Sequence, residues 1–166
     1  MATAPTTRFA RRRAGAPNRG FTLTELLAVI AVMGILGAAA APGITGLVDN
    51  QRARSASSDV FTALLRARSE AVRRNIQVTV TPVNDEAWNE GWSINNPGKP
   101  EALLVQDAMR NTTIAGPEDV TYLGNGRVSG NATLTFNIAS GDSARCIKLD
   151  VSGRPTQSKG ACPAQA

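Results

Sequence analysis

The chain has 166 residues, which corresponds to one domain or to one domain with an appendage. Hydrophobic residues make up 42% and charged residues 19%, so a disordered, collagen-like or coiled-coil chain is excluded. Histidine is absent and there are two cysteines, which excludes Ser-His-Asp and Cys-His catalysis and an ordinary zinc site. We therefore expect no enzyme, no metal and no cofactor.

The net charge of +5 comes from the first twenty residues. They contain five arginines and no acid, so 18 − 5 = 13 basic side chains remain to face the 13 acids of residues 21–166. The pI of 10.0 is therefore no argument for nucleic-acid binding. A basic segment directly before an apolar one instead predicts a cytoplasmic N-terminus, by the positive-inside rule.

An apolar segment covers residues 21–41, with Glu25 as its one charged side chain. As a helix it would be about 31 Å long, close to the hydrocarbon thickness of a bilayer. A secretory signal peptide cleaved near Ala41 is an alternative, which would leave a periplasmic binding module without an anchor. Glu25 argues against it, because a carboxylate in an apolar helix costs about 2.5–3.5 kcal/mol and is therefore expected to have a role.

Residues 19–27, Arg-Gly-Phe-Thr-Leu-Thr-Glu-Leu-Leu, resemble the class III signal of type IV prepilins and type II secretion pseudopilins. The resemblance implies that a prepilin peptidase cuts between Gly20 and Phe21 on the cytoplasmic side and methylates the new amino terminus of Phe21. The apolar helix then stays on the protein. Pro42 stands where such helices often carry a kinking proline.

Glu25 has two interpretations. After cleavage the free amine of Phe21 would lie in an apolar phase, and a carboxylate of a neighbouring subunit is a natural partner, since buried charges need pairing. The family resemblance implies this pairing during filament assembly. Thr22 and Glu25 also have the spacing of a capping box within one helix, and both roles can hold at different stages.

Helical periodicity continues beyond Pro42 and predicts one helix over residues 22–74. Its second half has a narrow apolar stripe that suits packing on a sheet, formed by Ala53, Ala56, Val60, Leu64, Ala67 and Ala71. Six arginines are expected mostly on the other, solvated faces, with contact to phosphate or acidic partners as the alternative: Arg52, Arg54, Arg66, Arg68, Arg73 and Arg74.

After residue 75 the period changes to alternation, which predicts a strand over residues 76–81. Further short strands are expected around 91–95, 101–106, 119–123, 132–138 and 144–151. The short connections favour antiparallel pairing in one small sheet. Trp88 and Trp92 are expected to cover the end of its core, and a stacking platform for bases is the alternative.

These elements predict an α+β fold, in which a long N-terminal helix with a transmembrane first half packs on an antiparallel β-sheet head, and the resemblance implies that this fold is pilin-like. We expect a leader at 1–20, a transmembrane assembly helix at 21–42, its amphipathic continuation at 43–75 and the head at 76–166. Cys146 and Cys162 are an even pair in a region expected outside the cytoplasm, which predicts a disulfide, with free thiols as the alternative.

Residues 146–154, followed by Cys162, resemble the C-terminal end of the GspH/FimT branch of the family. The resemblance implies a minor pilin or minor pseudopilin. Some members of the FimT type bind DNA through a Gly-Arg-x-Arg tail, and here Gly153 and Arg154 match but Thr156 replaces the second arginine. DNA binding is therefore an alternative role for the basic tail residues Arg145, Lys148, Arg154 and Lys159.

The resulting prediction is a minor subunit of a type IV pilus or a type II secretion pseudopilus, anchored once in the inner membrane with a periplasmic head and then assembled into the filament near its tip. The resemblance implies a prepilin peptidase and other pilins or pseudopilins as partners. An enzyme that uses carboxylates such as Asp85, Glu86 or Glu90 is the remaining alternative, and nothing in the sequence places two of them in one site.

Overall fold

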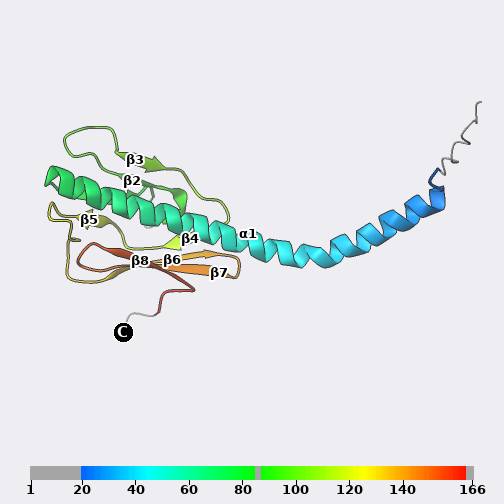
Figure 1. The fold of residues 1–166 in the computed structure, drawn as a ribbon. Coiled ribbons are helices and arrows are strands. Elements are labelled where there is room, and N and C mark those ends of the chain that lie inside the picture. Colours follow the sequence, from blue (N-terminus) through cyan, green and yellow to red (C-terminus); the bar gives the residue numbers. More distant parts are fainter. Residues whose placement is uncertain (1–19, 85–86, 164–166) are drawn as a thin grey trace, which may run out of the picture. The chain divides into compact units, whose positions relative to one another are not determined.

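The computed structural model describes residues 20–84 and 87–163, apart from the side chains of residues 40–43 (Figure 1). Almost all of the expected leader, residues 1–19, lies outside this range. The chain forms two compact units, residues 1–40 and 41–166. The side chain of Pro42 is not among those described, so the kink expected there stays a prediction.

Helix α1 spans Leu23–Arg74, which confirms the single helix expected over 22–74. In the first unit the large apolar side chains of this helix are exposed, between 43% for Val29 and 76% for Leu23. Among the described residues no single helix is long and apolar enough to cross a membrane. By length and composition, Leu23–Ala39 and Ile44–Arg74 meet that requirement when taken together.

The second unit contains two four-stranded sheets, and every strand pairing in them is antiparallel. The first sheet has the order β3-β2-β1-β5 and consists of β1 (Val78–Pro82), β2 (Trp92–Ile94), β3 (Leu104–Gln106) and β5 (Val120–Tyr122). The second has the order β4-β6-β7-β8 and consists of β4 (Thr113–Ala115), β6 (Leu134–Ser140), β7 (Ser143–Leu149) and β8 (Pro155–Lys159). A short 3₁₀ helix, η1 (Trp88–Glu90), precedes β2.

The expected α+β fold with an antiparallel β head is confirmed, but its strands form two sheets in place of one, and the strands β4 and β8 were not predicted. Both are edge strands of the second sheet. β4 buries one residue of three, and β8 buries only Pro155 of its five. Neither strand shows the alternation of apolar residues by which a strand is recognised in a sequence. Both are held in place by backbone hydrogen bonds to β6 and β7.

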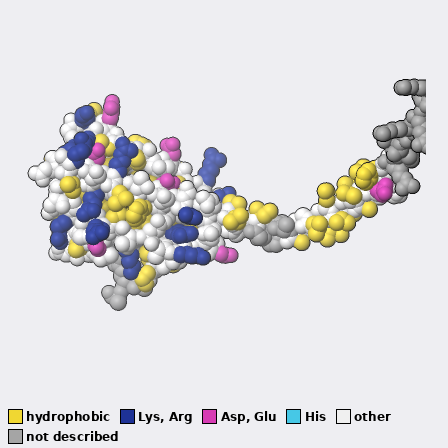
Figure 2. All heavy atoms as spheres, viewed as in Figure 1, with side chains coloured by type: hydrophobic (Ala, Val, Ile, Leu, Met, Phe, Trp, Pro, Cys, Tyr) yellow, Lys and Arg dark blue, Asp and Glu magenta, His cyan; other side chains and the backbone are white. Residues whose placement is uncertain are grey.

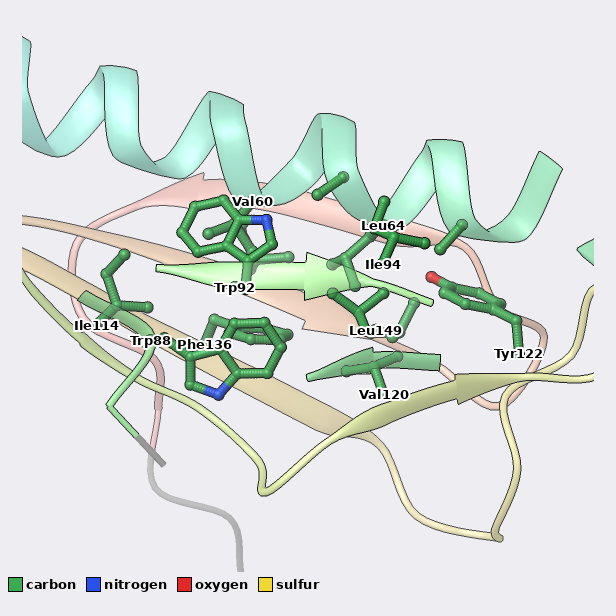
Figure 3. Packing of buried hydrophobic residues seen from close by; sticks show 14 of the residues in the cluster. Val60, Leu64, Trp88, Trp92, Ile94, Ile114, Val120, Tyr122, Phe136 and Leu149 are labelled. Carbon is green, nitrogen blue, oxygen red and sulfur yellow. The ribbon is translucent and has the colours of Figure 1, made fainter. Parts of the chain in front are cut away.

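The core lies between α1 and the two sheets (Figure 3). All six residues of the expected apolar stripe of the helix are at most 3% exposed. Four of them are alanines, and such small side chains let the helix backbone lie close to the strands. Trp88 and Trp92 are 1% and 0% exposed, and the ring of Trp88 lies edge-on to Phe136 with centroids 4.9 Å apart. Buried indoles cannot stack on bases, so the stacking platform was a wrong interpretation.

Candidate functional sites

The N-terminal end of α1 forms a closed capping box. The backbone N–H and the hydroxyl of Thr22 both donate to Oε2 of Glu25 at 2.9 Å, and the N–H of Glu25 donates to Oγ1 of Thr22 at 3.2 Å. These reciprocal bonds satisfy donors that the first helical turn leaves free. The capping interpretation of Glu25 therefore holds for the single, unassembled chain.

The expected cleavage site between Gly20 and Phe21 is exposed to solvent. A side-chain carbon at Gly20 would meet no atom within 4 Å, and Phe21 is 83% exposed. The peptide bond between them is therefore accessible to a protease. The apolar side chains that follow Phe21 are exposed as well. An exposed apolar surface of this length indicates a segment that contacts a membrane or other proteins.

The Gly-Arg pair of the tail lies in the tight turn between β7 and β8. Oδ1 of Asp150 accepts the N–H of Ser152 at 2.8 Å, the hydroxyl of the same serine and the N–H of Arg154 at 3.4 Å. The serine hydroxyl is the main reason why the pKa of Asp150 is lowered, since these bonds favour the charged carboxylate. The turn is thus held by its own backbone and side chains.

Gly153 connects this turn to a distant loop. Its φ is +79°, and a β-carbon there would lie 2.0 Å from the carbonyl oxygen of Gly126. Arg68 of α1 donates from Nε to the same Gly126 oxygen at 3.0 Å and from Nη2 to the carbonyl of Ser152 at 3.3 Å. Sequence reasoning placed Arg68 on a solvated face and missed this contact. Its position beside Leu64 and Ala67 of the apolar stripe was the available signal.

The four basic residues of the tail do not form one patch. Arg145 and Lys159 are opposite each other in the β7–β8 register, and Nη2 of Arg145 donates to Oδ1 of Asn50 on α1 at 3.1 Å. Lys148 lies on the opposite face of β7, because side chains alternate along a strand and its neighbours in sequence are buried. Arg154 lies at the other end of the hairpin, in the turn.

Cys146 of β7 and Cys162 form a disulfide, as expected, with Cα atoms 4.9 Å apart. The N–H of Cys162 also donates to Oδ1 of Asn137 at 3.1 Å. The segment after β8 is therefore tied to the middle of the second sheet.

The described residues bring no cluster of metal ligands together. No three Asp, Glu, Cys or His side chains among them are placed to hold a metal ion. Asp85 and Glu86 lie outside the described residues, and Glu90 accepts a hydrogen bond from Asn84.

Two family models match the chain. The family model described as type II transport protein GspH matches residues 56–153, more than half of the chain, and the model of the prokaryotic N-terminal methylation motif matches residues 16–41. No curated protein matches the chain.

A minor pilin has a similar fold, and a minor pseudopilin is also among the solved structures that the chain matches. The type IV minor pilin FimU of Pseudomonas aeruginosa is 25% identical, and in two crystal forms the TM-scores are 0.59 and 0.57. The match covers 65% and 63% of this chain and 89% and 91% of FimU. The minor pseudopilin EpsH from the type 2 secretion system of Vibrio cholerae matches at 14% identity with a TM-score of 0.48, over 66% of this chain and 97% of EpsH.

Proposed function

The chain belongs to the GspH family, the minor pilins and pseudopilins of type IV pili and type II secretion systems, and we propose that it enters a filament after cleavage between Gly20 and Phe21. The observation that carries the proposal is the open glycine–phenylalanine bond directly before a capped apolar helix. A prepilin peptidase would cut this bond and methylate the amine of Phe21.

Glu25 would then exchange one partner for another. In the single chain its carboxylate accepts bonds from Thr22 at the water-accessible helix end. When the exposed apolar segment packs among other subunits, an unpaired carboxylate there is costly, and the methylated amine of Phe21 on a neighbouring subunit can pair with it. The same glutamate thus stabilises the free helix end first and the subunit contact afterwards.

The proposed route of the protein follows from this chemistry. The arginine-rich leader stays in the cytoplasm, the apolar segment crosses the inner membrane once, and the head with its disulfide lies in the periplasm. The subunit then joins other pilins or pseudopilins, near the tip of the filament. Its work is assembly, not catalysis. DNA binding is not part of this proposal, because Lys148, Arg154 and the pair Arg145 and Lys159 lie at three different places on the head.

The test separates the two roles of Glu25 with two variants of the full chain in its native host. Glu25→Gln removes the charge, and we expect normal cleavage but a loss of about tenfold or more in filament incorporation, because an amine within the apolar phase loses its counter-charge. Thr22→Val removes only the hydroxyl of the capping box, and incorporation should stay within about twofold of the parent. Mass spectrometry of the mature N-terminus and immunoblots of sheared filaments measure the two steps.

Two results would contradict the proposal. A mature N-terminus near Ala41 in place of N-methylated Phe21 would identify a secretory signal peptide. Equal incorporation of Glu25→Gln and the parent would show that the carboxylate has no part in assembly.

A further inference from the structure

Apolar and basic side chains surround α1 at the N-terminal end of the second unit. We call this surface the collar, and it consists of Ile44, Leu47, Val48, Arg52, Arg54, Arg145 and Lys159. Ile44 is 59% and Leu47 is 68% exposed, and neither belongs to the hydrophobic core. Figure 2 shows Lys and Arg side chains spread over the visible face of the head, and those at this end lie beside hydrophobic ones.

Three cations of the collar, Arg54, Arg145 and Lys159, lie on the side of α1 that carries Asn50, and Arg52 lies on another side of the helix. Arg145 bonds to Asn50 of α1, and Lys159 lies opposite Arg145 on β8. Asn50 and Lys159 also line one open cavity of about 520 Å³. Arg54 follows Asn50 by four residues and so lies on the same side of the helix. Arg52 bonds to Asp49 on the neighbouring side.

The acids at this end of the head leave the collar positive. Asp49 is occupied, since its Oδ1 accepts the hydroxyl of Ser140 at 3.2 Å and a guanidinium nitrogen of Arg52 at 3.3 Å. Asp142, in the turn between β6 and β7, is exposed and lines the same cavity as Lys159. With Asp59 and Arg110, which line a second cavity together with Arg52, five cations at this end of the head face three carboxylates.

The position of the collar in the sequence places it at a membrane surface. Residues 26–48 contain no charged side chain, so by composition the apolar stretch that could span a bilayer continues to the first members of the collar. The collar begins inside the end of this stretch, at Ile44, and its first cation is Arg52. Its apolar members therefore belong at the acyl boundary and its cations at the level of the headgroups.

We propose that the collar binds the anionic phospholipid headgroups of the outer leaflet of the inner membrane, and so holds the head on the bilayer before assembly. This inference rests on the membrane insertion argued under the proposed function. Exposed apolar side chains next to cations are the combination that binds an anionic membrane surface. Because such attraction falls off within about 8 Å at physiological salt, the contact ends when the subunit leaves the bilayer.

The three lysines of the chain allow a test with internal controls. Lys159 belongs to the collar, Lys148 lies on the opposite face of β7, and Lys99 is in the loop between β2 and β3. The full chain is placed in nanodiscs of phosphatidylcholine alone or with about one third phosphatidylglycerol, and each lysine is labelled with an amine reagent. In the anionic discs we expect labelling of Lys159 to fall about threefold, with Lys148 and Lys99 unchanged. The protection should disappear in about 0.5 M NaCl.

A pair of variants with equal changes in charge tests which cations are responsible. The variant Arg52→Gln/Arg54→Gln/Arg145→Gln removes the three arginine charges of the collar and keeps Lys159 for labelling. In this variant the anionic discs should no longer protect Lys159 from the amine reagent. The control variant Arg73→Gln/Arg127→Gln/Arg154→Gln removes three arginines elsewhere on the head, and protection of Lys159 should remain.

The outcomes distinguish the failure of this inference from that of the proposed function. If the chain co-elutes with the discs but Lys159 reacts equally in both lipids, the collar does not bind headgroups and the membrane anchor stands. If the chain does not enter discs at all, both proposals fail. Protection of Lys159 by a short DNA duplex, without protection by phosphatidylglycerol, would make the collar a nucleic-acid surface and overturn the inference.

Discussion

The glycine and the arginine of the tail have different surroundings although they are neighbours in the sequence. Gly153 is buried against the carbonyl of Gly126, where Arg68 also donates. Arg154 is exposed, its backbone N–H donates to Asp150, and its positive charge helps to lower the pKa of that carboxylate. The glycine is therefore required for packing, whereas the arginine acts on the turn from the surface.

Replacing Gly153 with alanine should destabilise the head by about 3 kcal/mol or more, because the new β-carbon would both occupy a left-handed conformation and overlap a backbone oxygen. Gly98→Ala is the matched control, since Gly98 has a φ of +81° but no atom within 4 Å of an added carbon. It should cost only about 1 kcal/mol.

Urea unfolding of the full-length variants in detergent, followed by the fluorescence of the buried Trp88 and Trp92, measures both losses. Equal losses for the two alanine variants would show that the contact with Gly126 contributes nothing and that backbone strain alone is responsible.

At the scale of elements, the sequence predicted those parts of the fold that its own periodicity encodes. The helix and its apolar stripe from Ala53 to Ala71 follow a 3.6-residue period, and β1, β6 and β7 contain alternating apolar residues. β4 and β8 have no such pattern, since their places are fixed by hydrogen bonding to neighbouring strands. The division into two sheets depends on which strands pair over long distances in the chain, as β1 does with β5, and no local periodicity encodes that choice.

The candidate sites also include parts that local sequence spacing predicts and parts that only the tertiary structure determines. The capping box of Thr22 and Glu25 was predictable, because a three-residue spacing has one geometry at a helix start. The separation of Lys148 from Arg145 and Lys159 depends on strand alternation and on the register with the unpredicted β8. The hydrogen bond between Arg145 and Asn50 joins residues far apart in the chain, and no local sequence pattern predicts it.

The disulfide should matter more to the stability of the second sheet than any one surface ion pair. Closing the loop between Cys146 and Cys162, which are 16 residues apart, is worth about 3 kcal/mol in the chain-entropy model, against at most about 1 kcal/mol for an exposed pair. We expect dithiothreitol to lower the urea midpoint of the parent accordingly. The variant Cys146→Ala/Cys162→Ala should be equally destabilised and insensitive to the reductant, and a further loss on reduction would contradict this account.

At the scale of the whole molecule, the protein has two separate basic features. The leader carries the entire excess charge in its five arginines, whereas residues 21–166 balance 13 cations against 13 acids. The collar is positive only because the fold distributes a balanced set of charges unevenly. The first feature acts on topology before cleavage, and we infer that the second acts on lipid contact afterwards.

Cleavage after Gly20 should therefore change the isoelectric point sharply. The precursor has a pI of 10.0, and loss of five arginines without any acid leaves equal numbers of basic and acidic side chains, so the mature form should focus at about pH 6–8. Methylation of the Phe21 amine keeps its positive charge and does not alter this expectation. Isoelectric focusing of membranes from strains with and without the prepilin peptidase measures the shift. Cleavage near Ala41 would also remove Glu25 and leave 13 cations against 12 acids, so a product that stays basic and lacks residues 21–41 would refute the processing argued above.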